Sequence, residues 1–290
     1  MIPFKARQSV LGATIKGEAL RIWLVDAFTN TPFQGNPAGV CLVQSFPSTD
    51  FMQNIAAEMN WSQTAFVEQK SDTHFHIRWF SPRDEAPICG HATLASAHVL
   101  WEQKIARTNL ITFDSLGGPL TACKQKDQQG WITLDFPTRL VAPCPMPELL
   151  MTALGDVCVQ SVHKDETVYL VVLSSTEEVL SMDPSLHLIE QLSCRAIIVT
   201  ARSDDSYANG RYDFISRYFA PKVGIPEDPV CGSAHCRLTP FWAAALGKDT
   251  LLAHQASRRG GVLRVATQGD RVSISGQAIT VGEGTLGLFS

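Results

Sequence analysis

The chain has 290 residues, of which 45% are hydrophobic and 18% charged, and its mean hydropathy is +0.03. The length predicts two domains of roughly 140 residues each, and the composition is that of a globular protein rather than a disordered or fibrous one. A net charge of −4 without any Lys/Arg run argues against a nucleic-acid partner. No apolar stretch approaches the roughly 20 residues that span a membrane, so no membrane partner is expected.

Taken in chain order, apolar periodicity and turn residues predict a loose extension over residues 1–18 and then two lobes, 19–140 and 141–290. Proline-rich sequence near 137–147 marks the predicted boundary between them. Asp50 is the expected cap of the first helix. The predicted strands cover 21–27, 39–43, 75–79, 131–136, 168–173 and 196–199, and the predicted helices cover 50–59, 92–103 and 234–246.

An internal repeat links the two halves of the chain. Residues 77–101 and 216–246 each contain Arg, an aromatic residue, Phe, a small residue and Pro, then a polar loop and a Cys-Gly pair that opens an Ala-rich helix. Such a repeat predicts two lobes of like topology whose equivalent loops face one another across a pseudo-twofold axis. A cleft between such lobes is a favoured place for a small-molecule site. The matching positions are Arg78 and Arg217, Pro82 and Pro221, Cys89 and Cys231, and Gly90 and Gly232.

Each Cys-Gly pair places a thiol beside a helix N-terminus, where unpaired N–H groups favour an anion. Gly90 and Gly232 would let a carboxylate approach the backbone closely. The helix ends are expected to lower the pKa of the thiols of Cys89 and Cys231. The alternative is that both cysteines are simply small buried residues.

Three more side chains accompany these pairs. His91 would lie at the mouth of the cleft, where a histidine can carry a proton near neutral pH. Asp228, three residues before Cys231, could orient that histidine or act as a base itself, and Ser233 adds a hydroxyl donor. The alternative for Asp228 is a turn residue before Pro229.

Metal and cofactor signals are weak. His74 and His76 share a strand face, and Cys231, His235 and Cys236 are close in sequence, but neither group has a recognised zinc spacing. The glycine motifs of dinucleotide and nucleotide triphosphate binding are absent, as is that of serine hydrolases. No metal and no cofactor is therefore expected. Eight cysteines without a CxxC pair or a signal peptide indicate reduced thiols and a cytoplasmic protein.

Several segments together resemble the PhzF-like (phenazine biosynthesis-like) isomerase family. In order they are DAFTNTPFQGNPAGV, NWSQTAFVE, ICGHATLASAHVL, DFPT and GIPEDPVCGSAH. The resemblance implies the α+β fold of diaminopimelate epimerase, in which each of two pseudo-symmetric lobes is a curved, mostly antiparallel sheet around a central helix. It also implies a site between the lobes and no cofactor, and because family members are often dimers it leaves a homodimer open.

The resemblance assigns roles to particular residues. His91, Asp228 and Ser233 stand where the family has its active-site His, Asp and Ser, while Gly90 and Gly232 stand where backbone amides hold substrate. Ser62 belongs to the same substrate-binding set. Gln63 stands where the family has a proton-shuttling Glu, and an amide has no proton to exchange at neutral pH.

Three functions follow from these residues. The first is a cofactor-independent isomerase that acts on a small carboxylic acid, with His91, Asp228 and Gln63 at its centre. The second is a two-cysteine epimerase or racemase, because Cys89 and Cys231 stand where those relatives carry their paired thiols. The third is a carboxylate-binding protein without catalysis.

Overall fold

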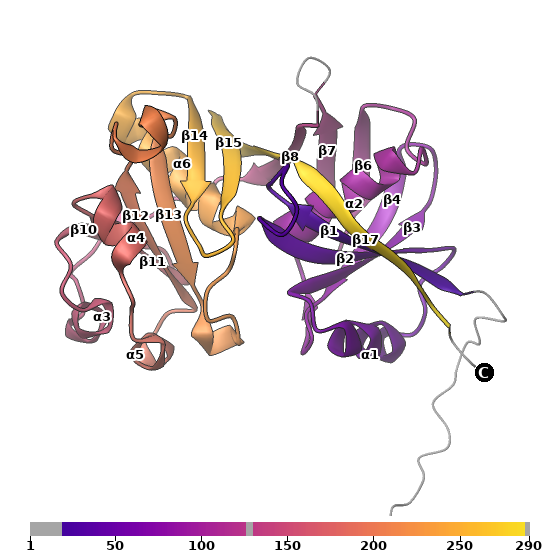
Figure 1. The fold of residues 1–290 in the computed structure, drawn as a ribbon, viewed down its shortest axis with the longest axis horizontal. Helices are drawn as coiled ribbons and strands as arrows, with labels where there is room; N and C mark the ends of the chain where they lie inside the picture. Colours follow the sequence, from indigo (N-terminus) through magenta and orange to yellow (C-terminus); the bar gives the residue numbers. More distant parts are fainter. Residues whose placement is uncertain (1–18, 126–129, 288–290) are drawn as a thin grey trace, which may run out of the picture.

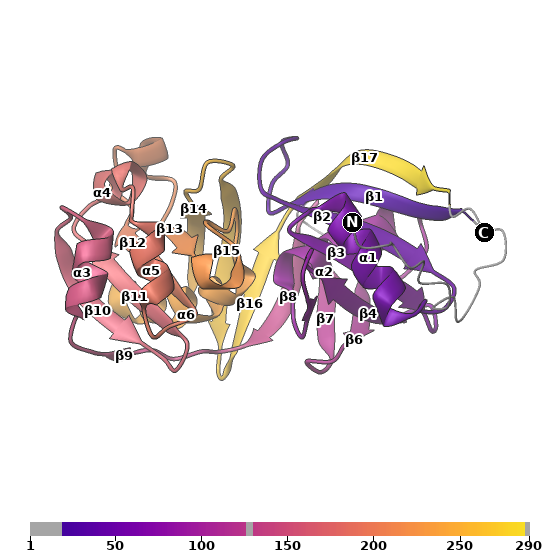
Figure 2. The ribbon, with the colours of Figure 1, turned by 90° about the horizontal axis from the view of Figure 1, so that it is seen from below.

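The computed structural model describes residues 19–125 and 130–287, which form one network of 17 strands with helices packed on it (Figures 1 and 2). This confirms the predicted α+β fold. The predicted extension over residues 1–18 lies outside the described residues. We call β1–β8 with β17 the first lobe and β9–β16 the second lobe.

The first lobe consists of the following elements in chain order: β1 (Leu20–Ala27), β2 (Asn36–Val43), α1 (Thr49–Met59), β3 (Gln63–Gln69), β4 (His74–Phe80), β5 (Glu85–Ala86), α2 (Gly90–Glu102), β6 (Leu110–Asp114), β7 (Leu120–Lys124) and β8 (Ile132–Pro137). The second lobe and the last strand follow: β9 (Ala142–Pro143), α3 (Glu148–Leu154), β10 (Val159–Lys164), β11 (Val168–Leu173), α4 (Thr176–Ser181), α5 (Leu186–Gln191), β12 (Ala196–Arg202), η1 (Tyr207–Gly210), β13 (Phe214–Phe219), η2 (Pro221–Val223), α6 (Gly232–Leu246), β14 (Thr250–Gln255), β15 (Gly261–Gln268), β16 (Arg271–Gly276) and β17 (Ala278–Leu286).

Strand pairing repeats between the lobes and confirms their like topology. In the first lobe, β1–β2 is antiparallel, β2–β3 parallel, β3–β4 antiparallel, β4–β6 parallel, and β6–β7 and β7–β8 antiparallel. The series from β10 to β16 has the same directions in the same order. The mixed pairing, with most pairs antiparallel, suits sheets that curve around one helix each.

The two lobes are joined by strands that pass from one to the other. The equivalent strands β8 and β16 pair antiparallel at the centre of the molecule. Short β9 pairs with β10, and β17 returns to pair with β1 along the first lobe (Figure 1). The last strand thus lies beside the first half of the chain, and the domain boundary near residue 140 stays a prediction.

Both central helices are buried on most sides, as their nearly uniform apolar sequence predicts. Leu94 and Val99 of α2 and Leu238 of α6 are fully buried in a core shared by the two lobes. Two smaller cores lie outside the sheets, one around Met52 under α1 and one around Leu150 under α3 and its neighbours. The central helices are therefore held rigidly at the point where the lobes meet.

The start of α1 differs from the prediction. Ser48 is the cap, and its Oγ accepts a hydrogen bond from the N–H of Phe51 at 3.3 Å, whereas Asp50 lies in the first turn. The expectation of an Asp50 cap was therefore wrong. Asp is favoured both as a cap and in the first helical turn, so its type alone does not separate the two positions.

An ion pair ties the lobes together beside the central strands. Asp26 on β1 is 1% exposed, and its carboxylate accepts hydrogen bonds from the N–H of Phe33 and from Arg259, each at 2.7 Å. The same guanidinium donates to the carbonyl of Gly35 at 2.8 Å. Because Arg259 belongs to the turn between β14 and β15, this cluster connects the β1–β2 loop to the second lobe.

We expect Arg259→Ala to lower the free energy of unfolding by about 3 kcal/mol, because it leaves the buried carboxylate of Asp26 without its cation. Arg259→Lys should lose less, since it keeps the charge but not the planar fork. Urea unfolding of the three proteins measures the difference. A loss for the alanine variant below about 0.5 kcal/mol, the usual size of a surface change, would contradict the role of this pair.

Candidate active site

The N-termini of α2 and α6 meet where the lobes join. Cys89 and Cys231 are the N-cap residues of these helices, and both have extended backbones. A Cβ atom on Gly90 would lie 3.5 Å from the Cα of Gly232, and the reverse distance is the same. The helix ends therefore approach so closely that a single methyl group on either glycine would already be in van der Waals contact with the other helix.

Equivalent arginines hold the loops that precede the helices. Arg78 binds both carboxylate oxygens of Glu85 at 2.7 Å, and Arg217 binds Glu227 at 2.7 and 3.0 Å. These bidentate pairs are geometrically specific. The arginines that the repeat singled out thus fix the two loops leading to Cys89 and Cys231.

A chain of hydrogen bonds crosses from one lobe to the other. Asn36 Nδ2 donates to Asp228 Oδ1 at 2.6 Å and to the carbonyl of Val230 at 2.9 Å. Its Oδ1 lies 3.0 Å from the hydroxyl of Ser62, which in turn lies 3.2 Å from Nε2 of His91. The structure therefore brings Asp228, Ser62 and His91 into one network.

The network determines the tautomer of His91. The hydroxyl of Ser62 has one proton, and its other neighbours, the oxygens of Asn36 and Pro37, are acceptors only. Oγ of Ser62 therefore accepts from Nε2–H of His91, which leaves Nδ1 as the acceptor, 3.5 Å from the Cys89 sulfur. Burial lowers the pKa of His91 to about 3, so the ring is neutral at neutral pH, unlike the proton carrier that the sequence suggested.

Asp228 is the carboxyl group of this network. Burial raises its pKa to about 7, although hydrogen bonds from Cys231 and Asn36 act in the opposite direction. Its loop is held by Gln255, which donates to the carbonyl of Asp228 at 2.7 Å and accepts from the N–H of Cys231 at 2.8 Å. A carboxyl group with such a pKa can both take and return a proton near neutral pH.

The two thiols differ from the expectation of a lowered pKa. Burial raises the pKa of Cys89 to about 12 and outweighs the hydrogen bonds from the helix N–H groups. Burial and the nearby charge of Asp228 raise the pKa of Cys231 well above its usual value. Both groups are therefore protonated thiols in this arrangement. Helix ends lower a thiol pKa only where desolvation is smaller than it is here.

Gln63 begins β3 and shares a face with Ala65 and Val67, which pack around α2. Its side chain is 9% exposed, and Oε1 has no hydrogen-bond partner among the described residues. A buried carbonyl oxygen without a donor costs free energy. This atom is thus suited to accept a hydrogen bond from a bound molecule.

Other predicted positions lie nearby. Ser233 is exposed and its hydroxyl lies 3.2 Å from the sulfur of Cys231. Asn36 and Gln255, by contrast, were missed as site residues. Asn36 stands in the GNPA segment that carries the family resemblance, but nothing local shows that it reaches Asp228, 192 residues away.

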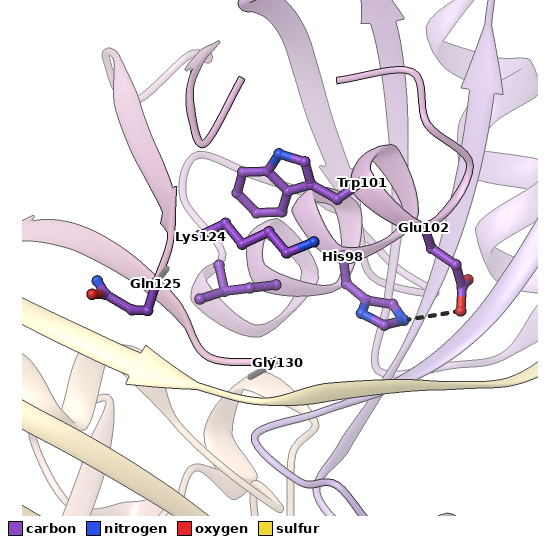
Figure 3. Close-up of a pocket in the computed structure, with 7 residues that line it drawn as sticks. His98, Trp101, Glu102, Lys124, Gln125 and Gly130 are labelled. Carbon is purple, nitrogen blue, oxygen red and sulfur yellow. Dashed lines mark ion pairs between the residues drawn. The ribbon is translucent and has the colours of Figure 1, made fainter. Parts of the chain in front are cut away.

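Two cavities lie away from these residues. One, of about 560 Å³, is at the C-terminal end of α2, where His98 and Glu102 form an ion pair at 3.5 Å (Figure 3). The other, of about 430 Å³, lies between the β1–β2 loop and the second lobe. Within residues 19–125 and 130–287, no group of three His, Cys, Asp or Glu side chains is placed to hold a metal, and no helix is long and apolar enough to cross a membrane.

The fold and the paired helix ends define a class of two-lobed epimerase-like proteins. A probable proline racemase from Agrobacterium radiobacter has the same fold, with a TM-score of 0.61 over 93% of each chain at 12% identity. A crystal structure of a PhzF-family phenazine biosynthesis protein from Enterococcus faecalis is closer. It has a TM-score of 0.87 and 36% identity, and covers 93% of this chain and 100% of that one.

The family model described as phenazine biosynthesis-like protein matches residues 25–284. An uncharacterized isomerase of Halalkalibacterium halodurans is 45% identical over 264 residues, which is 90% of this chain and 96% of the relative. The chain therefore belongs to the phenazine biosynthesis-like family, and it is an enzyme of the isomerase type.

The raised pKa of Asp228 predicts a pH dependence of stability. Between about pH 4 and 7 the folded protein keeps a proton on Asp228 that the unfolded chain has lost, so this group's stabilisation falls as the pH rises and is gone above about 7. The lowered pKa of His91 has the opposite effect on stability. The stabilisation that His91 contributes is complete above about pH 6.5 and is lost as the pH falls toward 3.

Asp228→Asn isolates the contribution of Asp228, because both proteins share His91. The free energy of unfolding of the variant, relative to that of the parent, should rise by on the order of 3 kcal/mol from pH 4.5 to pH 8. The pH is sampled in steps of roughly half a unit. Urea unfolding at each pH measures the difference. A difference that does not change with pH would show that the pKa of Asp228 is not raised.

Proposed function

We propose that the chain is a cofactor-independent isomerase that moves a proton within a small carboxylic acid bound where α2 and α6 meet. The observation that carries this proposal is Asp228, whose pKa is about 7 and whose Oδ1 is held 2.6 Å from Asn36 of the other lobe. Proton transfer is most efficient when the acid–base group has a pKa near the working pH.

Each remaining group has a role in this proposal. Backbone N–H groups at Gly90 and Gly232 bind the substrate carboxylate, because helix N-termini favour anions. Neutral His91 donates to the hydroxyl of Ser62 and so holds the hydrogen-bond network in the position that orients the substrate. Gln63 accepts a hydrogen bond from a hydroxyl or amino group of the substrate, which supplies the partner that its Oε1 lacks.

One carboxyl group carries the proton, and while Asp228 holds it the proton can exchange with solvent. The carboxylate of Asp228 removes a proton from carbon, and the electron pair delocalises toward the substrate carboxylate held by the helix ends. The protonated Asp228 then returns the proton to a second carbon as the double bond shifts. One group acts as base and then as acid, so Gln63 need not ionise.

A two-cysteine epimerase is the second candidate, supported by the equivalent positions of Cys89 and Cys231 at the two helix starts. It requires one thiolate and one thiol on opposite faces of a carbon. The raised pKa of both thiols makes that state costly while the site is desolvated.

Asp228→Asn should reduce deuterium exchange into substrate at least about 100-fold, the usual size of a lost general acid–base group. Cys89→Ser and Cys231→Ser should each keep exchange within about tenfold of the parent, because they leave the carboxylate in place. NMR in heavy water on a panel of small carboxylic acids, including amino acids and a dihydro-hydroxyanthranilate, measures the exchange.

Loss of exchange in both serine variants, with activity retained in Asp228→Asn, would replace the proposal by the two-cysteine epimerase. Saturable binding of an acid with no exchange in the parent would contradict proton transfer to or from that acid. In that case Gln63→Glu is the informative variant, since it returns an ionisable group to the position where the family carries a glutamate.

Asn36→Ala tests the positioning of Asp228. The hydrogen bond from Asn36 lowers the pKa of Asp228, so its loss should move the pH profile of exchange to higher pH. We expect the maximal exchange rate to fall about tenfold or more because the carboxylate is no longer held in place. The matched control is Asn54→Ala on α1, where the side chain is exposed and lines neither the site nor the second cavity. A reduced rate with an unmoved profile would indicate a purely structural role.

A further inference from the structure

The cavity of about 430 Å³ is built by both lobes and is separate from the residues proposed for catalysis. One wall is the β1–β2 loop, residues 28–34. The opposite wall contains Arg211 and Tyr212 before β13, His254 at the end of β14, and the β14–β15 turn. A ligand here would contact two segments that the Arg259 ion pair already holds together.

The lining is strongly basic for a protein whose net charge is −4. Arg211, Arg258 and Arg259 line the cavity, whereas no Asp or Glu is among its lining residues. Arg259 is neutralised by Asp26. Arg211 and Arg258 line the cavity and have no ion pair with any residue in the described ranges, so two of its three arginines are not neutralised by a direct carboxylate contact.

Aromatic rings lie next to these charges. The Arg211 guanidinium lies 5.5 Å from the centroid of the Tyr212 ring, and Tyr212 stacks on His254 with centroids 5.0 Å apart. The hydroxyl of Tyr207 is 2.7 Å from Nδ1 of His254, which holds the imidazole in place. Two cations beside a fixed ring face suit an organic anion better than a bare monovalent ion.

We propose that this cavity binds a small organic anion that carries at least two negative charges as carboxylate or phosphate groups. Arg211 and Arg258 supply the neutralising charges, and the β1–β2 loop closes over the ligand from the first lobe. This is a second ligand site, and it does not depend on the function proposed for Asp228.

The cavity shares a wall with the active-site loop. Gln255 faces Asp228 and Cys231, while its neighbours His254 and Ser257 line the cavity, and the hydroxyl of Ser257 donates to the carbonyl of Pro229 at 2.8 Å. An anion bound between the lobes would therefore also hold the loop that carries Asp228. Its binding should stabilise the folded protein by mass action.

Isothermal titration calorimetry with inorganic pyrophosphate and with succinate, at constant ionic strength, tests the proposal on the full chain. At least one probe should bind saturably at millimolar concentration or below. The probe that binds more tightly identifies phosphate or carboxylate as the preferred group. Arg211→Gln and Arg258→Gln should each weaken binding about tenfold, the size of a lost charge-assisted hydrogen bond, and the double variant should abolish it.

Arg107→Gln is the matched control, since Arg107 is exposed in the first lobe, does not line the cavity and loses the same charge. It should bind the probes as the parent does. Asp228→Asn should also bind them, because Asp228 does not line the cavity. Loss of binding in the Arg211/Arg258 double variant separates this site from the helix ends, since neither arginine lies there. No saturable binding of either probe, or equal binding by the parent and the Arg211/Arg258 double variant, would overturn the proposal.

Discussion

A Cβ atom on either Gly90 or Gly232 would come within 3.5 Å of the Cα of the other residue, and this close approach of α2 and α6 governs the rest of the site. It brings two helix N-termini, and the thiols that cap them, to one place in the molecule. Because the surrounding core covers most of this place, desolvation is the largest cause of the pKa shifts of His91, Asp228 and both cysteines. The pKa values of His91, Asp228 and both cysteines follow mainly from that one packing constraint.

Desolvation disfavours the charged form of each of these groups. It keeps His91 neutral by lowering its pKa, and it keeps the thiols neutral by raising theirs. Burial likewise favours the neutral form of Asp228 and raises its pKa, but only to about 7, while the amide of Asn36 and the thiol of Cys231 both donate to its carboxylate and act in the opposite direction. Of the four ionisable groups at this site, only Asp228 therefore titrates near neutral pH. This is the physical basis for preferring Asp228 to the paired cysteines as the acid–base group.

The links between the lobes converge on the same region. Asn36 reaches Asp228, Arg259 reaches Asp26, and the N–H of Val262 donates to the carbonyl of Phe28 at 3.0 Å. The β1–β2 loop and the β14–β15 turn are therefore a single structural unit formed from both lobes. One side of this unit supports the network of Asp228, and the other side lines the arginine-rich cavity.

Much of the fold could be predicted from the amino-acid sequence, because its signals are local. The duplicated Arg-to-Cys-Gly pattern predicted two like lobes, and the apolar helices after Gly90 and Gly232 predicted their central position. The sequence also brought His91, Asp228 and Gln63 together as candidates through family resemblance. It did not reveal that β17 returns to β1, because pairing between strands more than 250 residues apart leaves no local pattern. Nor did it place Asn36 beside Asp228 or set the pKa of any site residue. Those properties depend on which side chains pack over each site residue, and only the tertiary structure decides that packing. Burial and long-range contacts form together when the lobes close around their helices.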